Sequence, residues 1–246
     1  MTAAWRVREY ESLTSTSDLC ATLAQAGEPE RLAVLAARQT AGRGSRGRSW
    51  ETLPGNLAVS VLLRPYSPSV TAGQWALLAA VALAEALEAS GAPPIRLKWP
   101  NDVMLNGSKL GGILLESGID AGRLAWLAIG FGANLAAAPD LQGVTLLPRP
   151  IPPRAVALTL LDRIDHWVRA VILSSRGLTE AVPADFAPVR RAWLERGPAM
   201  GTQLRLNLGG EQVAGAFAGL SDAGALLLRS ERGVRAFSTG DVLQGA

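Results

Sequence analysis

Apolar and polar positions along most of the chain form two kinds of segment. Short apolar runs typical of buried strands occupy residues 5–10, 31–38, 56–65, 95–99, 111–116 and 123–135. Longer segments with apolar residues at helical spacing occupy residues 14–26, 71–89, 153–174 and 184–197. The hydroxyl groups of residues 14–17 are suited to capping the first of these helices. The mixture predicts an α+β fold, in which helices pack on a mixed β-sheet.

The pattern changes after Gly197. Short alternating runs at 202–210, 211–230 and 233–243 are separated by glycine-rich turns, which is typical of hairpins in a small barrel. A domain of about 50 residues is near the lower limit for independent folding, so we expect it to pack against the larger one. The sequence therefore predicts two domains, residues 1–196 and 197–246.

Composition narrows the class of protein. A hydrophobic content of 48% supports a packed core, and the single cysteine, Cys20, excludes a disulfide framework or a multi-cysteine metal site. The single histidine, His166, lies in a helical pattern and is expected on a helix surface. The longest uncharged apolar run, 75–84, is too short to span a bilayer, and the N-terminus lacks a signal-peptide pattern, so we expect a cytoplasmic protein. The net charge of +3 is mild, but the isoelectric point of about 9.6 favours an anionic substrate or an acidic partner.

Two lysines stand out against this background. Lys98 and Lys109 are the only lysines in the chain, and every other basic side chain is an arginine. Lysine and arginine are nearly interchangeable at a solvated surface, but not where a compact, strongly hydrated ammonium is required. Their clustering favours a shared site for negative charge.

A loop rich in glycine and arginine, residues 38–56, follows a predicted strand. Its glycines match both a dinucleotide-binding fingerprint and a P-loop, but each of those motifs needs a helix that starts within the loop. Trp50 and the Pro54-Gly55 pair leave no room for that helix. An arginine–glycine nucleic-acid segment is also disfavoured, because such segments are usually long and disordered. A plain solvated loop remains the simplest alternative.

The side chains of this loop favour a polyanionic ligand. Arg43, Arg46 and Arg48 repel one another unless an anion lies among them, and guanidinium forks suit carboxylate and phosphate. Trp50 could stack on a flat ring. The sequence has no evident metal-ligand cluster, catalytic Ser–His pair or nucleophilic cysteine. We therefore expect catalysis by positioning and charge neutralisation of a nucleoside triphosphate and a carboxylate.

Four segments together resemble the bacterial biotin protein ligases. They are GRGSRGRSW, KWPNDV, KLGGILLE and IGFGANL, in the order and spacing of that family. ESLTSTSD also resembles the family's Ser-Thr-Asn segment, and GLSDAGALLL resembles its C-terminal barrel. The resemblance covers most of the chain. It implies a core like that of the class II aminoacyl-tRNA synthetases, with an SH3-like C-terminal barrel.

The resemblance also implies a two-step reaction. Biotin and MgATP give biotinyl-5′-AMP and pyrophosphate, and a lysine of a biotin carboxyl carrier domain then takes the biotin. Lys109 should bridge the biotin carboxylate and the α-phosphate, and Lys98 should neutralise phosphate charge. Arg43 should bind the carboxylate or the adenylate phosphate. Asp102 should orient or deprotonate the acceptor amine.

The resemblance further implies which residues surround each substrate. Those expected around biotin are Ser15, Thr16, Ser17, Gln39, Gly42, Arg43, Gly44, Ser45, Lys109, Gly112 and Gly130. Those expected around ATP are Arg46, Arg48, Trp50, Asn101, Lys109 and Asn134. Glu116 has the simpler interpretation of a surface acid at the end of a strand.

Two departures and several alternatives stay open. Ser45 stands where relatives usually carry arginine, which puts retention of the adenylate in doubt, and Ser17 replaces the usual asparagine. A lipoate–protein ligase of the same fold would need a longer apolar channel and no polar cluster for a ureido ring. A non-catalytic protein that binds biotin or a nucleotide is a further alternative, although capture of biotin alone would need no phosphate site. The chain begins almost at the catalytic domain, so DNA binding is not expected, and the protein could be a monomer or a homodimer.

Overall fold

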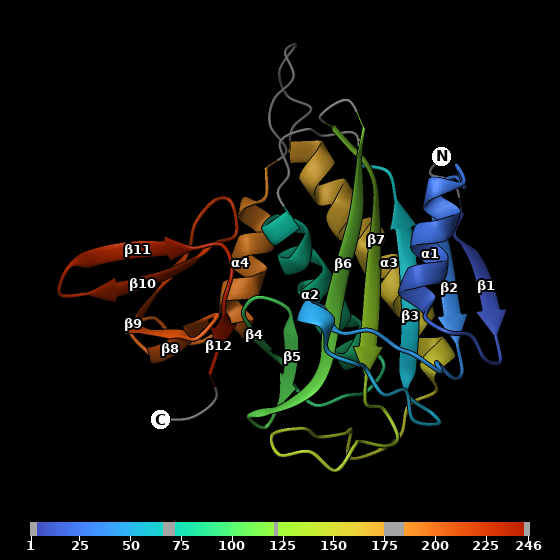
Figure 1. Cartoon of the computed structure of the whole chain (residues 1–246), viewed down its shortest axis with the longest axis horizontal. Helices are drawn as coiled ribbons and strands as arrows, with labels where there is room; N and C mark the ends of the chain where they lie inside the picture. The colour runs from blue at the N-terminus through green and yellow to red at the C-terminus, as the bar shows by residue number, and fades with distance from the viewer. Residues whose placement is uncertain (1–3, 66–71, 121–122, 175–184, 244–246) are drawn as a thin grey trace.

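The computed structural model describes residues 4–65, 72–120, 123–174 and 185–243. Seven strands form a mixed sheet in the order β1-β2-β3-β7-β6-β5-β4 (Figure 1). The β1–β2 pair is parallel and the other neighbouring pairs are antiparallel. The strands are β1 (Arg6–Tyr10), β2 (Leu32–Ala36), β3 (Leu57–Leu63), β4 (Arg96–Lys98), β5 (Asp102–Leu105), β6 (Ser108–Asp120) and β7 (Arg123–Ala133).

Helices cover both faces of this sheet. The helix α1 (Thr16–Gln25) lies on one face, and α2 (Ala72–Ala89) and α3 (Pro153–Ser174) pack together on the other (Figure 1). Side chains of β2 alternate between the two layers: Leu32 and Val34 pack with Cys20 of α1, while Ala33 and Leu35 join the core beneath α2. The predicted mixed sheet with helices packed against it is confirmed.

The strand β5 was not anticipated, because its four residues follow a polar turn and are too few to show a pattern. All four of its residues are buried, and the Trp99–Asn101 turn joins it to β4. The strand β6 is also longer than the run predicted from 111–116. His166 is exposed on α3, as predicted. The predicted first residues of two helices, 71 and 184, lie outside the described residues.

A second, smaller sheet follows the helix α4 (Ala187–Arg196). The antiparallel order is β11-β10-β9-β8-β12, and the sheet lies beside α4 at one side of the molecule (Figure 1). Its strands are β8 (Gln203–Leu208), β9 (Glu211–Leu220), β10 (Leu226–Ser230), β11 (Gly233–Phe237) and β12 (Asp241–Val242). This arrangement confirms the predicted small β domain, which we call the C-terminal barrel.

The C-terminal barrel is docked on the larger domain through specific hydrogen bonds. Trp99 Nε1 donates to the carbonyl oxygen of Gly224 at 3.1 Å, and Gln74 Nε2 donates to that of Asp222 at 2.9 Å. The Asp222–Gly224 turn is thus hydrogen-bonded to the start of α2 and to the turn before β5. None of the helices in the described part of the chain is both long and apolar enough to cross a membrane.

Cys20 should lower the stability of the fold at high pH. Burial and, secondarily, the charge of Glu116 raise the pKa of its thiol to about 12. The unfolded thiol has a pKa of about 8.5, so above that pH the unfolded chain loses a proton that the folded chain keeps. The protonated Cys20 thiol therefore makes its full contribution to the free energy of unfolding below about pH 8.5, and this contribution declines as the pH rises. The free energy of unfolding in urea should fall between pH 8 and pH 10.

The control for this prediction is Cys20→Ala, which has no thiol to titrate. Its free energy of unfolding should fall less over the same pH range, and the native unsubstituted protein should resist a thiol reagent at pH 9 until urea unfolds it. An equal reaction rate in the folded and unfolded states would contradict the raised pKa.

Candidate active site

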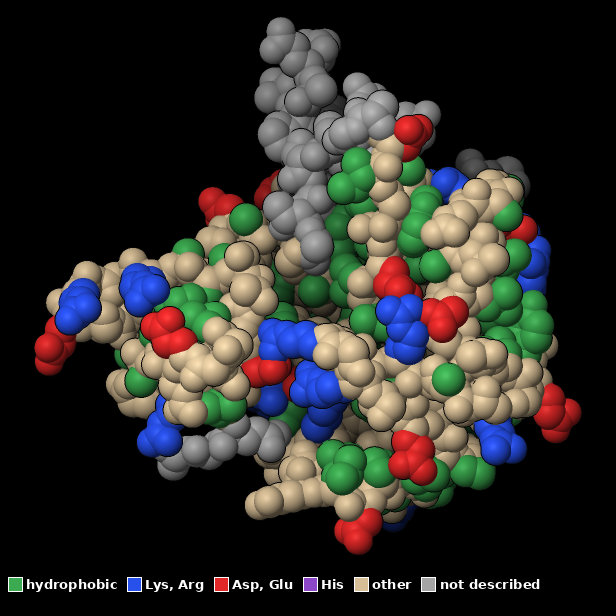
Figure 2. All heavy atoms as spheres, viewed as in Figure 1, with side chains coloured by type: hydrophobic (Ala, Val, Ile, Leu, Met, Phe, Trp, Pro, Cys, Tyr) green, Lys and Arg blue, Asp and Glu red, His purple; other side chains and the backbone are tan. Residues whose placement is uncertain are grey.

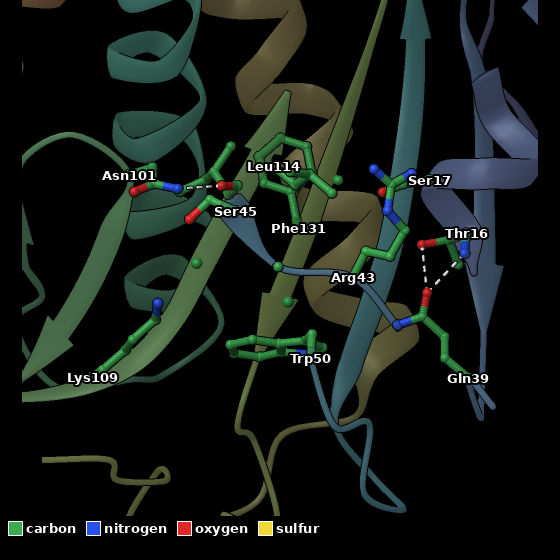
Figure 3. A pocket seen from close by; sticks show the side chains of 15 residues that line it. Thr16, Ser17, Gln39, Arg43, Ser45, Trp50, Asn101, Lys109, Leu114 and Phe131 are labelled. Atoms are coloured by element: carbon green, nitrogen blue, oxygen red, sulfur yellow. Dashed lines mark hydrogen bonds between the residues drawn. The ribbon is translucent and has the colours of Figure 1, made fainter. Parts of the chain in front are cut away.

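A cleft of about 420 Å³, open to solvent, lies where β6 and β7 meet the glycine–arginine loop. In Figure 3, Thr16, Ser17 and Gln39 lie at one end of the cleft, and Lys109 and Asn101 lie at the other. The cleft thus has a neutral polar end and a basic end. Its lining residues are Thr16, Ser17, Gln39, Arg43, Gly44, Ser45, Trp50, Asn101, Lys109, Gly112, Ile113, Leu114, Gly130, Phe131 and Gly132.

Connected hydrogen bonds organise the neutral end. Gln39 Oε1 accepts from the backbone N–H of Thr16 at 2.7 Å and from Thr16 Oγ1 at 3.1 Å. Ser60 Oγ donates to Thr16 Oγ1 at 2.8 Å and lies 3.2 Å from Ser17 Oγ. Gln39 Nε2 donates to Thr52 Oγ1 at 2.8 Å. We call these five side chains the polar chain. Because its groups hold one another, they present fixed donors and acceptors to a ligand.

Local sequence explains how this chain forms. Ser15 is the N-cap of α1 and its Oγ accepts from the backbone N–H of Asp18 at 3.3 Å, so Thr16 and Ser17 fall in the first turn facing the sheet. Ser15 itself does not line the cleft. Ser60 is fully buried in the middle of β3. Ser60 was not predicted as a site residue, although it is a single hydroxyl inside the apolar run LAVSVLL.

The glycine–arginine loop folds back on itself and forms one wall of the cleft. The backbone N–H of Trp50 donates to the carbonyl oxygen of Gly42 at 2.8 Å, and that of Gly44 donates to Arg48 at 2.7 Å. A Cβ atom on Gly42 would lie 2.3 Å from the Trp50 carbonyl oxygen, so this close approach requires glycine. The loop holds only a 3₁₀ turn, Ser45–Gly47, in place of the helix that a dinucleotide site needs.

Arg43 extends from this loop to two carboxylates. It forms ion pairs with Asp18 of α1 and, at 2.8 Å, with Glu116 of β6. The hydrogen bond to Asp18 raises the pKa of the Arg43 guanidinium, partial burial opposes this, and Glu116 adds to it. Glu116 lies in the middle of β6, and its second oxygen is buried without a hydrogen-bond partner. The interpretation of Glu116 as a strand-end surface acid is therefore wrong.

Both lysines bind one carboxylate at the basic end. Lys98 Nζ lies 3.1 Å from Asp102 Oδ2, and Lys109 Nζ lies 2.6 Å from Asp102 Oδ1. The contact between Lys109 and Asp102 is an ion pair and not a hydrogen bond, because Asp102 Oδ1 has no hydrogen-bond partner. The strand register brings these charged side chains together. Lys98 stands opposite Asp102 in the β4–β5 pair, and Asp102 stands opposite Gly112 of β6, the strand that carries Lys109. Lys109 lines the cleft, whereas Lys98 adjoins it through Asp102.

Trp50 lies between Lys109 and Gln39, at the lower middle of the view in Figure 3. Lys109 Nζ lies 5.9 Å from the centre of its ring. A Cβ atom on Gly132 would lie 2.5 Å from the same ring, so a glycine at that position lets the indole lie flat against β7. Gly130 and Gly132 lie two residues apart on one face of the strand. The indole Nε1 is buried without a hydrogen-bond partner.

The two asparagines have different positions. Asn101 lines the cleft and its Nδ2 donates to the carbonyl oxygen of Ile113 at 2.6 Å. Asn134 is buried outside the cleft lining, and its Nδ2 donates to the carbonyl oxygen of Thr145 at 3.0 Å. Asn134 thus holds the segment after β7, and a nucleotide could reach its side chain only after rearrangement.

Arg46 and Arg48 point away from the cleft, toward the C-terminal barrel. Arg46 forms an ion pair with Asp241 of β12 and donates to the carbonyl oxygen of Gly240. Arg48 Nη2 lies 3.8 Å from Asp241 and donates to Ser45 Oγ at 3.1 Å. Asp241 was not predicted as their partner, because no local sequence pattern relates it to a loop so far away in the chain.

Known protein families match both parts of the chain. The family described as the biotin/lipoate A/B protein ligase family matches residues 10–134, and the biotin protein ligase C-terminal domain matches residues 201–244. The biotin–[acetyl-CoA-carboxylase] ligase of Paracoccus denitrificans is 39% identical over 217 residues, which cover 86% of this chain and 90% of that protein. The ligase of the same name from Mycobacterium tuberculosis is 31% identical and covers 97% of this chain and 89% of that protein.

Solved structures show the same relationship. The biotin protein ligase of Aquifex aeolicus in complex with biotin and ATP superposes with a TM-score of 0.79 at 26% sequence identity. The superposition covers 96% of this chain and 97% of that one, so both the larger sheet and the C-terminal barrel are included.

Proposed function

This chain belongs to the biotin/lipoate A/B protein ligase family, and from that membership we infer that it is a biotin–[acetyl-CoA-carboxylase] ligase. It activates biotin with ATP to biotinyl-5′-AMP and transfers the biotinyl group to a lysine of a carrier domain. One observation carries the inference: a single cleft joins a neutral polar chain to a basic end. A neutral ureido ring suits the first, and phosphates suit the second.

The first step needs orientation and charge neutralisation. A carboxylate oxygen of biotin attacks the α-phosphorus of ATP, a new P–O bond forms, and the bond to the β-phosphate breaks to release pyrophosphate. Both reactants are anions, so their approach is opposed unless fixed positive charges lie at the point of attack. The Nζ atom of Lys109 lies within the cleft beside Trp50, which supports its assignment to that point.

The lysine pair is suited to exchange partners as the reaction proceeds. Lys98, Asp102 and Lys109 together carry a net charge of +1, and Asp102 is largely buried. Phosphate oxygens compete with Asp102 for Lys109, whereas Lys98 keeps the carboxylate paired. A buried carboxylate without any partner would be strongly unfavourable. Two lysines on one aspartate therefore allow one of them to leave.

The second step uses the carboxylate that Lys109 has left. The amine of the carrier lysine attacks the carbonyl carbon of the mixed anhydride, and AMP departs. The ammonium group of Lys109 lies 2.6 Å from Asp102 Oδ1, so the same position suits an incoming amine. There Asp102 orients the amine and takes its proton, which fits the distance that general-base catalysis requires.

Arg43 is proposed to change partners too. Its cluster with Asp18 and Glu116 has a net charge of −1, which would repel a ligand carboxylate if Arg43 stayed between them. Arg43 is about half exposed and lines the cleft, so it can turn to the carboxylate or the adenylate phosphate. Glu116 and Asp18 then determine how readily Arg43 is released.

Magnesium is proposed to accompany ATP as its counterion. Among the described residues, no group of three or more His, Cys, Asp or Glu side chains is arranged to hold a metal ion. Magnesium commonly keeps several waters and binds through substrate phosphates, so a dedicated protein cage is not required. The metal is therefore treated as part of the nucleotide substrate.

The polar chain also separates biotin from lipoate. A lipoate ring offers no ureido group, so it would lack the hydrogen bonds that a ureido ring can add to those which Thr16, Ser17 and Gln39 already make within the polar chain. Each such hydrogen bond contributes a net free energy of about 0.5–1.5 kcal/mol. The polar chain therefore favours biotin over lipoate as the acid that is activated.

Pyrophosphate release from MgATP tests the proposal. The protein would be assayed with biotin, with lipoate at the same concentration, and with neither acid. We expect release with biotin only, followed by one biotinyl group on the carrier domain by mass spectrometry and none on a carrier with its acceptor lysine replaced by arginine. Release with lipoate alone would overturn the substrate assignment. No release with either acid would favour a binding protein.

A further inference from the structure

The glycine–arginine loop and the C-terminal barrel meet at one carboxylate. Arg46 Nη1 pairs with Asp241 Oδ2 while Arg46 Nη2 donates to the carbonyl oxygen of Gly240, so both ends of its guanidinium fork are used. Arg48 approaches the other oxygen of Asp241 more loosely, at 3.8 Å. The light-blue turn near the centre of Figure 1 is this part of the loop, and Figure 2 shows acidic and basic side chains meeting at the seam beside the barrel.

The turn that contains Arg46 has an unfavourable backbone conformation, which other contacts must stabilise. Arg46 has φ 60° and ψ 38°, a left-handed conformation that residues other than glycine seldom adopt. Such conformations persist where surrounding contacts hold them. Gly44 and Ser45, immediately before Arg46, line the cleft. The contact to Asp241 therefore fixes the wall of the cleft as well as the arginine itself.

Arg46 and Arg48 differ in how firmly they are held. Arg46 has two charge-assisted contacts with the barrel, whereas the side chain of Arg48 is 55% exposed and is bound mainly within its own turn, to Ser45. A phosphate can bind Arg48 at little cost in free energy. To bind Arg46, it would have to displace both contacts of that guanidinium with the barrel. The two arginines therefore have separate functions, although their sequence context is the same.

We propose that Asp241 is a positioning residue for the nucleotide end of the site. It holds Arg46 as the anchor of the loop, so that Arg48 is the loop arginine that turns to the phosphates of ATP. The C-terminal barrel thereby completes the ATP site without contacting ATP. This proposal rests on the proposed ligase function and revises the expected role of Arg46 from a phosphate ligand to an anchor.

The barrel supplies a matched control. Asp222 also forms an ion pair with the larger domain, at 2.9 Å from Arg190 Nη1, but its side chain is 95% exposed and its partner lies in α4 and not in the loop. The docking bonds from Trp99 and Gln74 go to backbone oxygens, which survive substitution of either aspartate. Loss of the Asp241 carboxylate should therefore free the loop without detaching the barrel.

Asp241→Asn, Asp241→Glu and Asp222→Asn test the proposal. The isosteric Asp241→Asn change should raise the KM for ATP in biotin-dependent pyrophosphate release roughly fivefold, with a smaller rise in the KM for biotin. Trypsin should also cut the substrate-free protein faster after Arg46 or Arg48, because the loop is released. Asp241→Glu should keep both values near those of the unsubstituted protein, and Asp222→Asn should change neither.

The outcomes separate this proposal from the proposed function. An Asp241→Asn protein with an unchanged KM for ATP and an unchanged cleavage rate overturns it. Equal effects of Asp222→Asn and Asp241→Asn would also overturn it, since docking of the barrel as a whole would then be the cause. If the unsubstituted protein releases no pyrophosphate, the ligase function fails. The trypsin cleavage rates then test only whether Asp241 anchors the loop through Arg46. Faster cleavage of the Asp241→Asn protein supports this anchoring, and an unchanged rate refutes it.

Discussion

Replacement of Lys109 by alanine is expected to lower kcat for biotin-dependent pyrophosphate release by about a hundredfold to a thousandfold, as removal of one fixed donor from a transition state does in other enzymes. Negative charge accumulates where the carboxylate meets the α-phosphate, and Lys109 is the basic residue at that end of the cleft lining. Pyrophosphate release under saturating biotin and ATP measures the effect.

Lys98→Ala is the matched control for this prediction. Lys98 binds the same carboxylate but lies outside the cleft lining, so it should affect kcat less than Lys109 does. Lys109→Arg should recover little, because the larger planar guanidinium does not replace a compact ammonium beside the Trp50 ring. Equal losses in Lys98→Ala and Lys109→Ala would contradict the separate assignment of Lys109 to the reacting atoms.

The lysine pair shows what sequence can and cannot predict. The rarity of lysine in this chain predicted a shared site for Lys98 and Lys109, and both do pair with one carboxylate, while their binding of phosphate stays a prediction. The partner that unites them, Asp102, was expected to act separately on the acceptor amine. The sequence did not predict β5, and without β5 the register that brings Asp102 between the two lysines could not be derived.

Contacts made across the fold were beyond sequence analysis altogether. The partners of Arg43 come from α1 and β6, and that of Arg46 comes from β12 in the other domain. None of these pairs is related by a helical or strand period, so only the three-dimensional arrangement brings them together. Elements with strong patterns, such as α2 and the hairpins of the barrel, were predicted because hydrophobic spacing alone determines them.

The second large effect is expected from Gly130→Ala, which should weaken biotin binding roughly tenfold to a hundredfold. Gly130 stands opposite Ser60 in the β3–β7 pair, and a Cβ atom there would lie 2.4 Å from Ser17 Oγ and 3.3 Å from Ser60 Oγ. The added methyl group must displace the Ser17 hydroxyl and so breaks one end of the polar chain. Isothermal titration with biotin measures the change, while the KM for ATP should stay nearly constant.

A double variant tests whether this steric contact is the cause. The atom that the new Cβ approaches most closely is Ser17 Oγ, so Ser17→Ala removes the collision together with one hydrogen-bonding group. Gly130→Ala should therefore add little to the loss already caused by Ser17→Ala, because substitutions that act through one contact are not additive. If the two losses add in full, Gly130→Ala acts on biotin directly and the polar chain is not the reason for the glycine.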